Sequence, residues 1–268
     1  MPRVSPPKDP EYLTTLERGL SVLRAFDQTR PEMQLSEVAT ATGLSAAVAR
    51  RCLNTLVGLG YVGRHGRRFL LRPEVLAFGS AYASSMNIET IVTPPLQRLR
   101  DATGDSASMA VRSGADILYV AHVSTDRRIR LAVSAGTRFP WHATSLGKAI
   151  VAFEPTEVRA ALLEDTPVAR LTDRTLCERE PLAERLRAVA ARGYDQAQDE
   201  LDYGIVSVGV PVCGADGVSL AAINCSTSTT RVEPSEMIET RLPLLREAAR
   251  EIEAALTRFP ALARSLAR

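Results

Sequence analysis

The chain has 268 residues, of which 45% are hydrophobic, and its formal net charge is only +2. This length suffices for two domains, and so weak a net charge does not by itself suggest a nucleic-acid partner. No apolar run approaches the ~20 residues that a membrane-spanning helix requires, so no membrane partner is expected.

The charge is unevenly distributed along the chain. Residues 1–73 carry 11 Arg and Lys against 6 Asp and Glu, whereas residues 74–268 carry 22 against 25. A small basic module, of the kind that binds nucleic acid, therefore precedes a larger and mildly acidic one.

The first ten residues, MPRVSPPKDP, are polar and rich in proline, which predicts a disordered arm rather than a signal peptide. The four cysteines show no C-x-x-C spacing and are expected to be reduced core residues of a cytoplasmic protein. The three histidines lack ligand spacing, so neither a metal nor another cofactor is expected. These residues are Cys52, Cys177, Cys213 and Cys225, and His65, His122 and His142.

Residues 12–26 predict a first helix whose apolar side chains pack against the helices that follow. These side chains are Leu16, Leu20, Leu23, Ala25 and Phe26. A second, short helix is expected over 35–42, with the Ser36 hydroxyl as its N-cap. Gly43 follows at a point where a tight turn between two helices needs a positive φ.

The segment 45–59 predicts a third helix, which Ser45 caps and which has two distinct faces. Its buried stripe is expected to comprise Leu44, Val48, Cys52, Leu56 and Leu59. The opposite face begins with small residues that would let the helix enter a major groove, and continues with side chains that pair with guanine and adenine. The predicted DNA contacts on this helix are Ser45, Ala46, Ala47, Arg50, Arg51 and Asn54.

Two strands are predicted after this helix, over 61–64 and 68–71, around a turn at 65–67. Arg67 and Arg68 of this wing suit phosphates or the minor groove. A glycine between helices and adjacent arginines on a solvated face also occur in ordinary helical proteins. Here the turn, the small residues and the basic wing occur together and in order, which favours a winged helix–turn–helix that binds double-stranded operator DNA.

A linker helix is predicted over 73–86, with Pro73 in its first turn. Its Leu76, Phe78 and Tyr82 are mixed with small residues, which suggests contact with another subunit. A homodimer is expected, because helix–turn–helix proteins usually read paired half-sites as dimers.

The remainder of the chain predicts both strands and helices. Strands are expected over 107–112, 116–123, 129–133, 205–213 and 218–226, and helices over 96–102, 143–153, 155–163, 178–191 and 236–259. Hairpin turns at 113–114 and 214–217 join neighbouring strands. The simplest arrangement is therefore an α+β domain in which helices pack on an antiparallel sheet.

A small-molecule site is predicted where residues 141–149 begin a helix with small and hydroxyl side chains. Free backbone N–H groups at such a terminus bind an anion, for example a carboxylate. On the later strands, Ser207 shares a face with Ile205, and Asn224 shares a face with Ser226. If buried, these polar side chains need partners that a carboxylate ligand could supply; alternatively, they line the solvent face of the sheet.

Residues 145–148 also match S-x-x-K, the nucleophile motif of penicillin-binding hydrolases. Those enzymes need an S-D-N element and a later K-T-G element, and the chain contains neither. Lys148 is therefore expected to anchor a carboxylate or to cover apolar surface with its stem, and the chain is not expected to be an enzyme.

Over nearly its full length the chain resembles the IclR family of transcriptional regulators. The resemblance is carried by LERGLSVL at 16–23, the winged helix–turn–helix at 35–71, HATSLGKA at 142–149, and GIVSVGVPV at 204–212 with Gly193, Tyr194, Asp199 and Glu200 before it. It implies control of a nearby catabolic operon and homodimers that often pair into dimers of dimers. The predicted parts are a disordered arm (1–10), a winged helix–turn–helix domain (11–73), a linker helix (74–93), and a GAF-like effector-binding and oligomerisation domain (94–268).

The resemblance also implies which residues contact the effector. Carried over by position, the family's contacts fall on Ser145, Leu146, Ile205, Ser207, Asn224 and Ser226. Where relatives that sense glyoxylate and pyruvate place an acidic residue, this chain has Ala197. That difference argues against the same small keto acid.

Within the family, the chain looks like the branch that regulates the protocatechuate, p-hydroxybenzoate and β-ketoadipate pathway. This narrower resemblance rests on Thr42–Ser45 with Ala49–Arg51, the wing at 67–69 and the run at 221–227. It implies an aromatic carboxylate effector, such as protocatechuate or p-hydroxybenzoate, bound at the N–H groups of 145–147, with Met109 and Trp141 as further contacts for the ring. The alternatives are β-ketoadipate, a keto acid, or a larger domain that serves oligomerisation alone.

Overall fold

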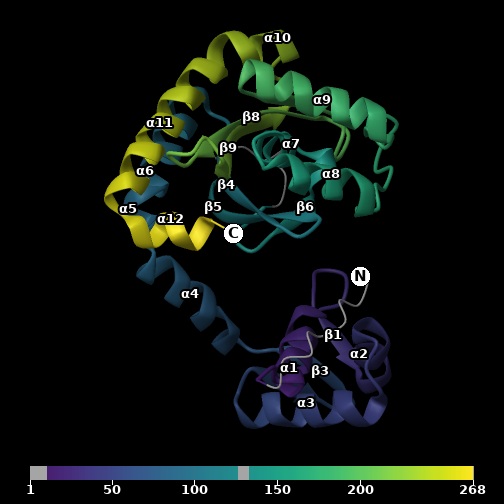
Figure 1. Ribbon diagram of the computed structural model, residues 1–268. Helices are drawn as coiled ribbons and strands as arrows, with labels where there is room; N and C mark the ends of the chain where they lie inside the picture. The colour runs from purple at the N-terminus through teal and green to yellow at the C-terminus, as the bar shows by residue number, and fades with distance from the viewer. Residues whose placement is uncertain (1–10, 126–132, 268) are drawn as a thin grey trace. The chain divides into compact units, whose positions relative to one another are not determined.

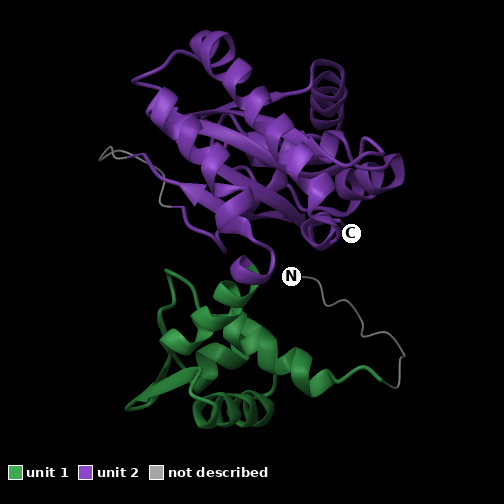
Figure 2. Ribbon diagram, turned by 90° about the vertical axis from the view of Figure 1, so that its left-hand side faces the viewer, with its two compact units in different colours: residues 1–82 green, residues 83–268 purple. Residues whose placement is uncertain are grey.

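The structure is a computed structural model that describes residues 11–125 and 133–267. These residues form two compact units, which divide between Tyr82 and Ala83 (Figure 2). The predicted arm at 1–10 and most of the predicted strand at 129–133 lie outside the described residues. Within the described ranges, no helix is long and apolar enough to cross a membrane.

The first unit packs α-helices against a small antiparallel sheet (Figure 1). Its elements are α1 (Thr14–Arg24), β1 (Glu32–Gln34), α2 (Leu35–Thr42), α3 (Ala46–Gly58), β2 (Val62–His65), β3 (Arg68–Leu71), the 3-10 turn η1 (Pro73–Val75) and α4 (Leu76–Ser85), within which the unit ends. The strand order is β1-β3-β2, so a third strand joins the two predicted wing strands. The sequence did not predict β1, because three residues are too few to show a period of two.

The turn between α2 and α3 forms at Gly43, whose φ is 64° as the tight connection requires. The helix α2 has its predicted bounds, but the predicted Ser36 cap is wrong, because the N-cap is Gln34. The Glu37 carboxylate accepts a hydrogen bond from the Gln34 N–H at 2.6 Å, which satisfies the start of the helix instead. Ser45 does cap α3: its Oγ accepts from the N–H of residue 48 at 3.4 Å.

Two apolar stripes of this unit differ from those predicted. On α1 the buried side chains are Val22 and, just beyond the helix, Ala25 and Phe26, whereas Leu16 and Leu20 are exposed. On α3 the buried stripe is Ala49, Cys52, Leu53 and Leu56, which follows the helical period, and Leu59 is 61% exposed. Each helix carries more apolar side chains than one buried face can accommodate, and the packing partner decided which face is buried.

The predicted linker helix is shorter than expected and is interrupted. Residues 73–75 form a 3-10 turn before α4, and Asn87, with a φ of 53°, separates α4 from α5 (Ile88–Ile91). Leu76 and Phe78 of α4 are exposed, although the Phe78 ring also stacks on Tyr61 of the same unit at 5.2 Å between centroids.

The second unit is built on a six-stranded sheet of order β6-β5-β4-β9-β8-β7, in which all neighbouring strands are antiparallel. The strands are β4 (Ser106–Ser113), β5 (Asp116–Val123), β6 (Arg138–Pro140), β7 (Asp195–Gln198), β8 (Ile205–Cys213) and β9 (Ser219–Ser228). The short edge strands β6 and β7 were not predicted from the sequence. The antiparallel sheet with helices packed on it confirms the predicted α+β class.

Helices cover both faces of this sheet (Figure 1). One face carries α7 (Ser145–Ala152), which follows the turn η2 (Trp141–Ala143), with α8 (Thr156–Asp165) and α9 (Arg179–Arg192) outside it. The other face carries α6 (Thr93–Thr103) and α11 (Leu242–Arg258). The predicted long C-terminal helix is instead divided into α10 (Pro234–Glu236), a π-turn (Met237–Arg241), α11 and α12 (Pro260–Leu266).

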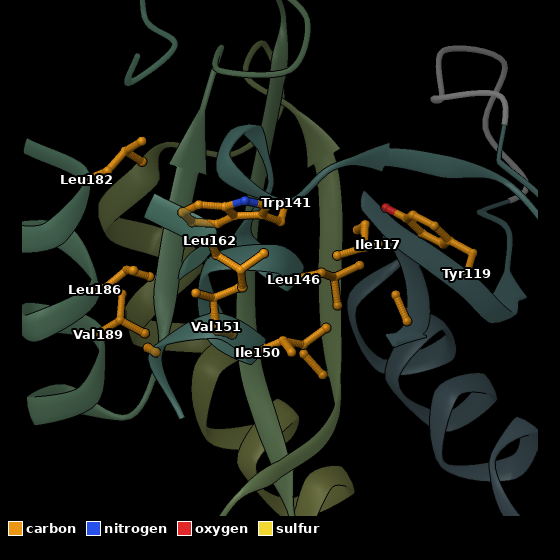
Figure 3. Packing of buried hydrophobic residues seen from close by; sticks show 14 residues of the cluster. Ile117, Tyr119, Trp141, Leu146, Ile150, Val151, Leu162, Leu182, Leu186 and Val189 are labelled. Carbon is orange, nitrogen blue, oxygen red and sulfur yellow. The ribbon is translucent and has the colours of Figure 1, made fainter. Parts of the chain in front are cut away.

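The core between the sheet and α7 fixes the position of that helix (Figure 3). Every residue of α7 is buried, and its Leu146 and Ile150 pack with Trp141 and with side chains of α9. A helix that is buried on all sides has its N-terminus held firmly against the sheet.

Candidate functional site

The first unit presents a candidate nucleic-acid face on α3. The residues predicted to contact DNA on this helix are all exposed: Ser45, Ala46, Ala47, Arg50, Arg51 and Asn54. Arg67 is also exposed, at the tip of the wing.

Arg68 differs from the other predicted DNA contacts, because its side chain lies along the wing and is half-buried. Its guanidinium donates to the Glu32 carbonyl at 3.2 Å and lies 3.6 Å from the Glu37 carboxylate. It therefore joins the wing to the start of α2, and these two contacts compete with a phosphate for the same guanidinium.

The second unit holds a pocket between one face of the sheet and the segment that enters α7. The pocket is lined by Tyr119, Ala143, Thr144, Ala197, Glu200, Leu201, Ile205, Ser207, Asn224 and Ser226. The strand register places its polar groups side by side, since Ser207 pairs with Ser226 of β9 and with Ala197 of β7. The free space is about 20 Å³, which is room for about one water molecule.

Two glycines allow α7 to pack closely against its surroundings: Gly147 against the preceding η2 turn, and Gly209 of β8 against the start of the helix. A Cβ on Gly147 would lie 2.2 Å from the Trp141 carbonyl oxygen, and one on Gly209 would lie 3.0 Å from the backbone of Ser145. Because the backbones meet so closely, Ser145 Oγ contacts Ser207 Oγ at 2.8 Å. The helix terminus and the strand thus join through two hydroxyl groups.

The N-terminus of α7 is partly satisfied by the chain itself. Thr144 Oγ1 accepts a hydrogen bond from the Gly147 N–H at 3.0 Å. The expectation that a ligand meets all the N–H groups of 145–147 is therefore wrong for Gly147. Within the described part of the chain, the N–H groups of Ser145 and Leu146 make no such hydrogen bond.

Asn224 supplies the pocket with an acceptor. The residue is 4% exposed and pairs with Ser108 of β4 and Gly209 of β8. Among the described residues, its Oδ1 has no hydrogen-bond partner. An unpaired buried acceptor costs free energy, so this oxygen is suited to a donor on a bound molecule.

Lys148 belongs to a buried cluster of charges behind the pocket. Its Nζ lies 2.5 Å from Glu200 Oε2 and 3.4 Å from Asp195 Oδ2. Asp195 also pairs with Arg185 at 2.6 Å. Lys148 thus anchors carboxylates of the chain itself, while Ser145 contacts Ser207, so the S-x-x-K match lacks the nucleophile–base contact that such chemistry requires.

Burial perturbs three titratable groups near the pocket. It lowers the pKa of His142, whose Nε2 donates to the Ala169 carbonyl at 3.0 Å. It raises the pKa of Glu200, against the opposing effect of Lys148. It also raises the pKa of the Tyr119 hydroxyl. Of these three groups, Glu200 and Tyr119 line the pocket itself.

The structure brings together some of the predicted effector contacts and separates others. Ile205, Ser207, Asn224 and Ser226 line the pocket, and Ser145 reaches it through Ser207. Leu146 and Trp141 belong to the core beneath it. Met109 pairs with Ile223 on the opposite face of the sheet, because side chains alternate along β4 and only every second one can face α7.

Sequence reasoning missed five lining residues: Tyr119, Ala143, Thr144, Glu200 and Leu201. A β-bulge at residues 109–110 shifts the pairing of β4 with β5 and so sets which β5 side chains face the pocket; this shift has no signature in the sequence. Glu200 was noted in the sequence, but its contact with Lys148 joins residues 52 positions apart.

Family models match both units of the chain. The model described as the IclR helix-turn-helix domain matches residues 15–66, and the one described as the bacterial transcriptional regulator IclR C-terminal matches residues 80–254.

Individual relatives are similar over most of the chain. The Pca regulon regulatory protein of Pseudomonas putida is 38% identical over 91% of this chain and 84% of its own length. The p-hydroxybenzoate hydroxylase transcriptional activator of Acinetobacter baylyi is 34% identical over 90% and 91%. The solved PobR inducer-binding domain from Acinetobacter, a double mutant in complex with 3-hydroxybenzoic acid, is 32% identical, with a TM-score of 0.56 over 60% of this chain and 94% of that one.

The relatives are named as transcriptional regulators, in agreement with the expectation that the chain is not an enzyme. Matches over both units, in the same order and over nearly the whole length, carry the assignment. The chain belongs to the IclR family of bacterial transcriptional regulators.

Proposed function

We propose that the chain regulates an aromatic-acid catabolic operon and senses a small aromatic carboxylate such as p-hydroxybenzoate or protocatechuate. The first unit would bind operator DNA through α3 and the wing. The second would bind the acid in the pocket at the N-terminus of α7.

The observation that carries this proposal is the pairing of two complementary groups across one small pocket. Thr144 lines the pocket directly before the N-terminus of α7, and a helix N-terminus stabilises a carboxylate. Asn224 offers a buried oxygen with no partner among the described residues, which a ring hydroxyl would satisfy. Ile205 and Tyr119 supply apolar surface for the ring between them. p-Hydroxybenzoate carries a carboxylate and a hydroxyl at opposite ends of a flat ring.

The names of the relatives support the same class of ligand. One acts on a p-hydroxybenzoate hydroxylase gene, and a solved inducer-binding domain holds 3-hydroxybenzoic acid.

We further propose that the chain acts as a homodimer, which can pair into a dimer of dimers. Leu13, Leu16 and Leu20 lie exposed on and beside α1, and Leu76 and Phe78 lie exposed on α4. Large apolar side chains clustered on exposed helices mark association surfaces. Two helix–turn–helix units held together in this way would read two half-sites of an operator.

Isothermal titration calorimetry with p-hydroxybenzoate, protocatechuate, benzoate, β-ketoadipate and pyruvate tests the proposed effector. Hydroxylated aromatic acids should bind, and benzoate should bind about 10-fold or more weakly, because it leaves Asn224 Oδ1 unpaired. Tighter binding of β-ketoadipate or pyruvate would reassign the effector. Heat from none of the five acids would contradict the proposal and favour a domain that serves oligomerisation alone.

A further inference from the structure

The pocket is too small for an aromatic ring as it stands. It offers about 20 Å³, whereas an engineered cavity of about 150 Å³ holds benzene. One wall must therefore move when a ring enters. Most of the lining residues belong to strands that ladder hydrogen bonds fix on both sides, or to the buried start of α7.

One lining segment lies outside the sheet and α7: residues 199–204, called the flap below, whose Glu200 side chain is also held from within by Lys148. It lies in neither helix nor strand and contributes Glu200 and Leu201 to the lining. Both of its ends adopt a left-handed backbone, with φ of 56° at Asp199 and 81° at Gly204. These ends are pinned together, because the Gly204 N–H donates to Asp199 Oδ1 at 2.6 Å and the Asp199 N–H donates to the carbonyl of residue 205 at 2.8 Å.

Residues 172–175, called the latch below, hold the flap from outside. Thr172 Oγ1 and Thr175 Oγ1 donate to the first two carbonyls of the flap at 2.5 and 2.7 Å. The Tyr203 hydroxyl donates to Asp173 Oδ2 at 3.1 Å and accepts from the Asp173 N–H at 3.2 Å. The latch lies in the connection between α8 and α9 and so belongs to neither the sheet nor α7.

We propose that the flap is the moving wall of the effector pocket, and that the latch keeps the pocket closed until a ligand displaces it. This inference rests on the proposed function. It adds that the latch, which does not contact the ligand, influences the affinity for the ligand. If the latch is intact in the ligand-free protein and broken in the complex, it opposes binding. Weakening the latch then strengthens binding, because less free energy is spent on opening.

The Tyr203→Phe variant tests this proposal, since Tyr203 is 59% exposed and its ring remains in place. The dissociation constant for p-hydroxybenzoate should fall about twofold to tenfold, as expected when the net contribution of one or two hydrogen bonds no longer opposes binding. The association rate should rise by a similar factor. Trp141, the chain's single tryptophan, lies buried beside the pocket and reports binding by fluorescence in stopped-flow measurements.

Two further variants test whether the effect of Tyr203→Phe on ligand binding is specific to the latch. Tyr194→Phe removes a hydroxyl from a ring that stacks on Arg192 and Arg246, away from the flap, and should leave both constants unchanged. Asp173→Ala removes the carboxylate that accepts from the Tyr203 hydroxyl and leaves the backbone N–H contact in place. The double variant with Tyr203→Phe should therefore bind no more tightly than Tyr203→Phe alone.

Hydrogen–deuterium exchange on the ligand-free protein separates this inference from the proposed function. Amides of the flap should exchange faster in Tyr203→Phe than in the wild type, while those of β8 stay the same. That result would support the latch even if no aromatic acid bound. Unchanged exchange of the flap, or a dissociation constant for p-hydroxybenzoate that is equal or higher in Tyr203→Phe, would overturn the proposal.

Discussion

Individual arginines of the first unit have different environments although the sequence presents them alike. Arg50 and Arg51 are exposed on α3, whereas Arg68 is bound to Glu32 and Glu37 of its own unit. Exposure leaves the first two able to reach base edges, while the contacts of Arg68 make its role partly structural.

Replacing Arg50 or Arg51 by Ala should therefore weaken specific operator binding by about 1–3 kcal/mol if that arginine reads a base. A mobility-shift titration against operator and scrambled DNA measures the effect. Arg68→Ala is the control, and should change the operator-to-scrambled ratio less. Unchanged operator affinity in both α3 variants would remove them from the readout.

Lys148 anchors carboxylates, which is one of the two roles expected from the sequence, and these carboxylates belong to the chain itself. Its amine lies between Glu200 and Asp195 with no exposed surface. Removing one partner of a buried ion pair leaves an uncompensated charge, which costs far more than the net worth of the pair.

The Lys148→Met variant should lower the free energy of unfolding by about 3–5 kcal/mol. Arg187→Met is the matched control, because Arg187 pairs with Glu180 at the surface and such pairs contribute about 1 kcal/mol or less. Chemical denaturation of both variants provides the comparison. A Lys148 variant as stable as the control would mean that the buried cluster is not a structural requirement.

At the scale of elements, the position of α7 depends on backbone contact. Gly147 faces the Trp141 carbonyl so closely that no side chain fits, and the neighbouring atoms are backbone that cannot rotate away. The pocket exists because this helix begins directly against β8.

Gly147→Ala should therefore lower the free energy of unfolding of the second unit by about 1–3 kcal/mol or more, the typical cost of overpacking. Gly79 lies in α4 with no atom near an added Cβ, so Gly79→Ala should be neutral or stabilise that helix by up to about 1 kcal/mol. Thermal unfolding of both variants tests the contrast, and equal melting temperatures would contradict the close approach.

The elements that the sequence predicted well are those with strong periodicity. The strands β5 and β8 have the predicted bounds, and α2 matches its predicted range. The strands β1, β6 and β7 have three or four residues and were missed. Their existence depends on a neighbouring strand to pair with, which local sequence does not encode.

At the scale of the whole molecule, DNA binding is proposed for the basic first part of the chain and effector binding for the acidic remainder. An effector can alter DNA affinity only if it binds two arrangements of the protein differently, and the coupling must be reciprocal. The factor by which the effector changes operator affinity should therefore equal the factor by which the operator changes effector affinity.

Titrating p-hydroxybenzoate with and without saturating operator should give the same coupling factor as titrating operator with and without the acid. Ser207→Ala removes the hydroxyl that contacts Ser145, and should weaken effector binding while leaving operator affinity in the absence of effector intact. Loss of DNA binding in this variant would instead mark Ser207 as structural. Unequal factors in the wild type would rule out a simple two-state linkage.

The sequence by itself determined the winged helix–turn–helix, the α+β class and the polar face of β8 and β9. Each depends on local periodicity, capping or alternation, which neighbouring residues specify. Tertiary structure alone decided that Met109 faces away from the pocket, that Lys148 neutralises Glu200 and Asp195, and that the flap is held by residues 172–175. These outcomes depend on register and on contacts between distant segments, and the free energy that selects them comes from packing that no short stretch of sequence contains.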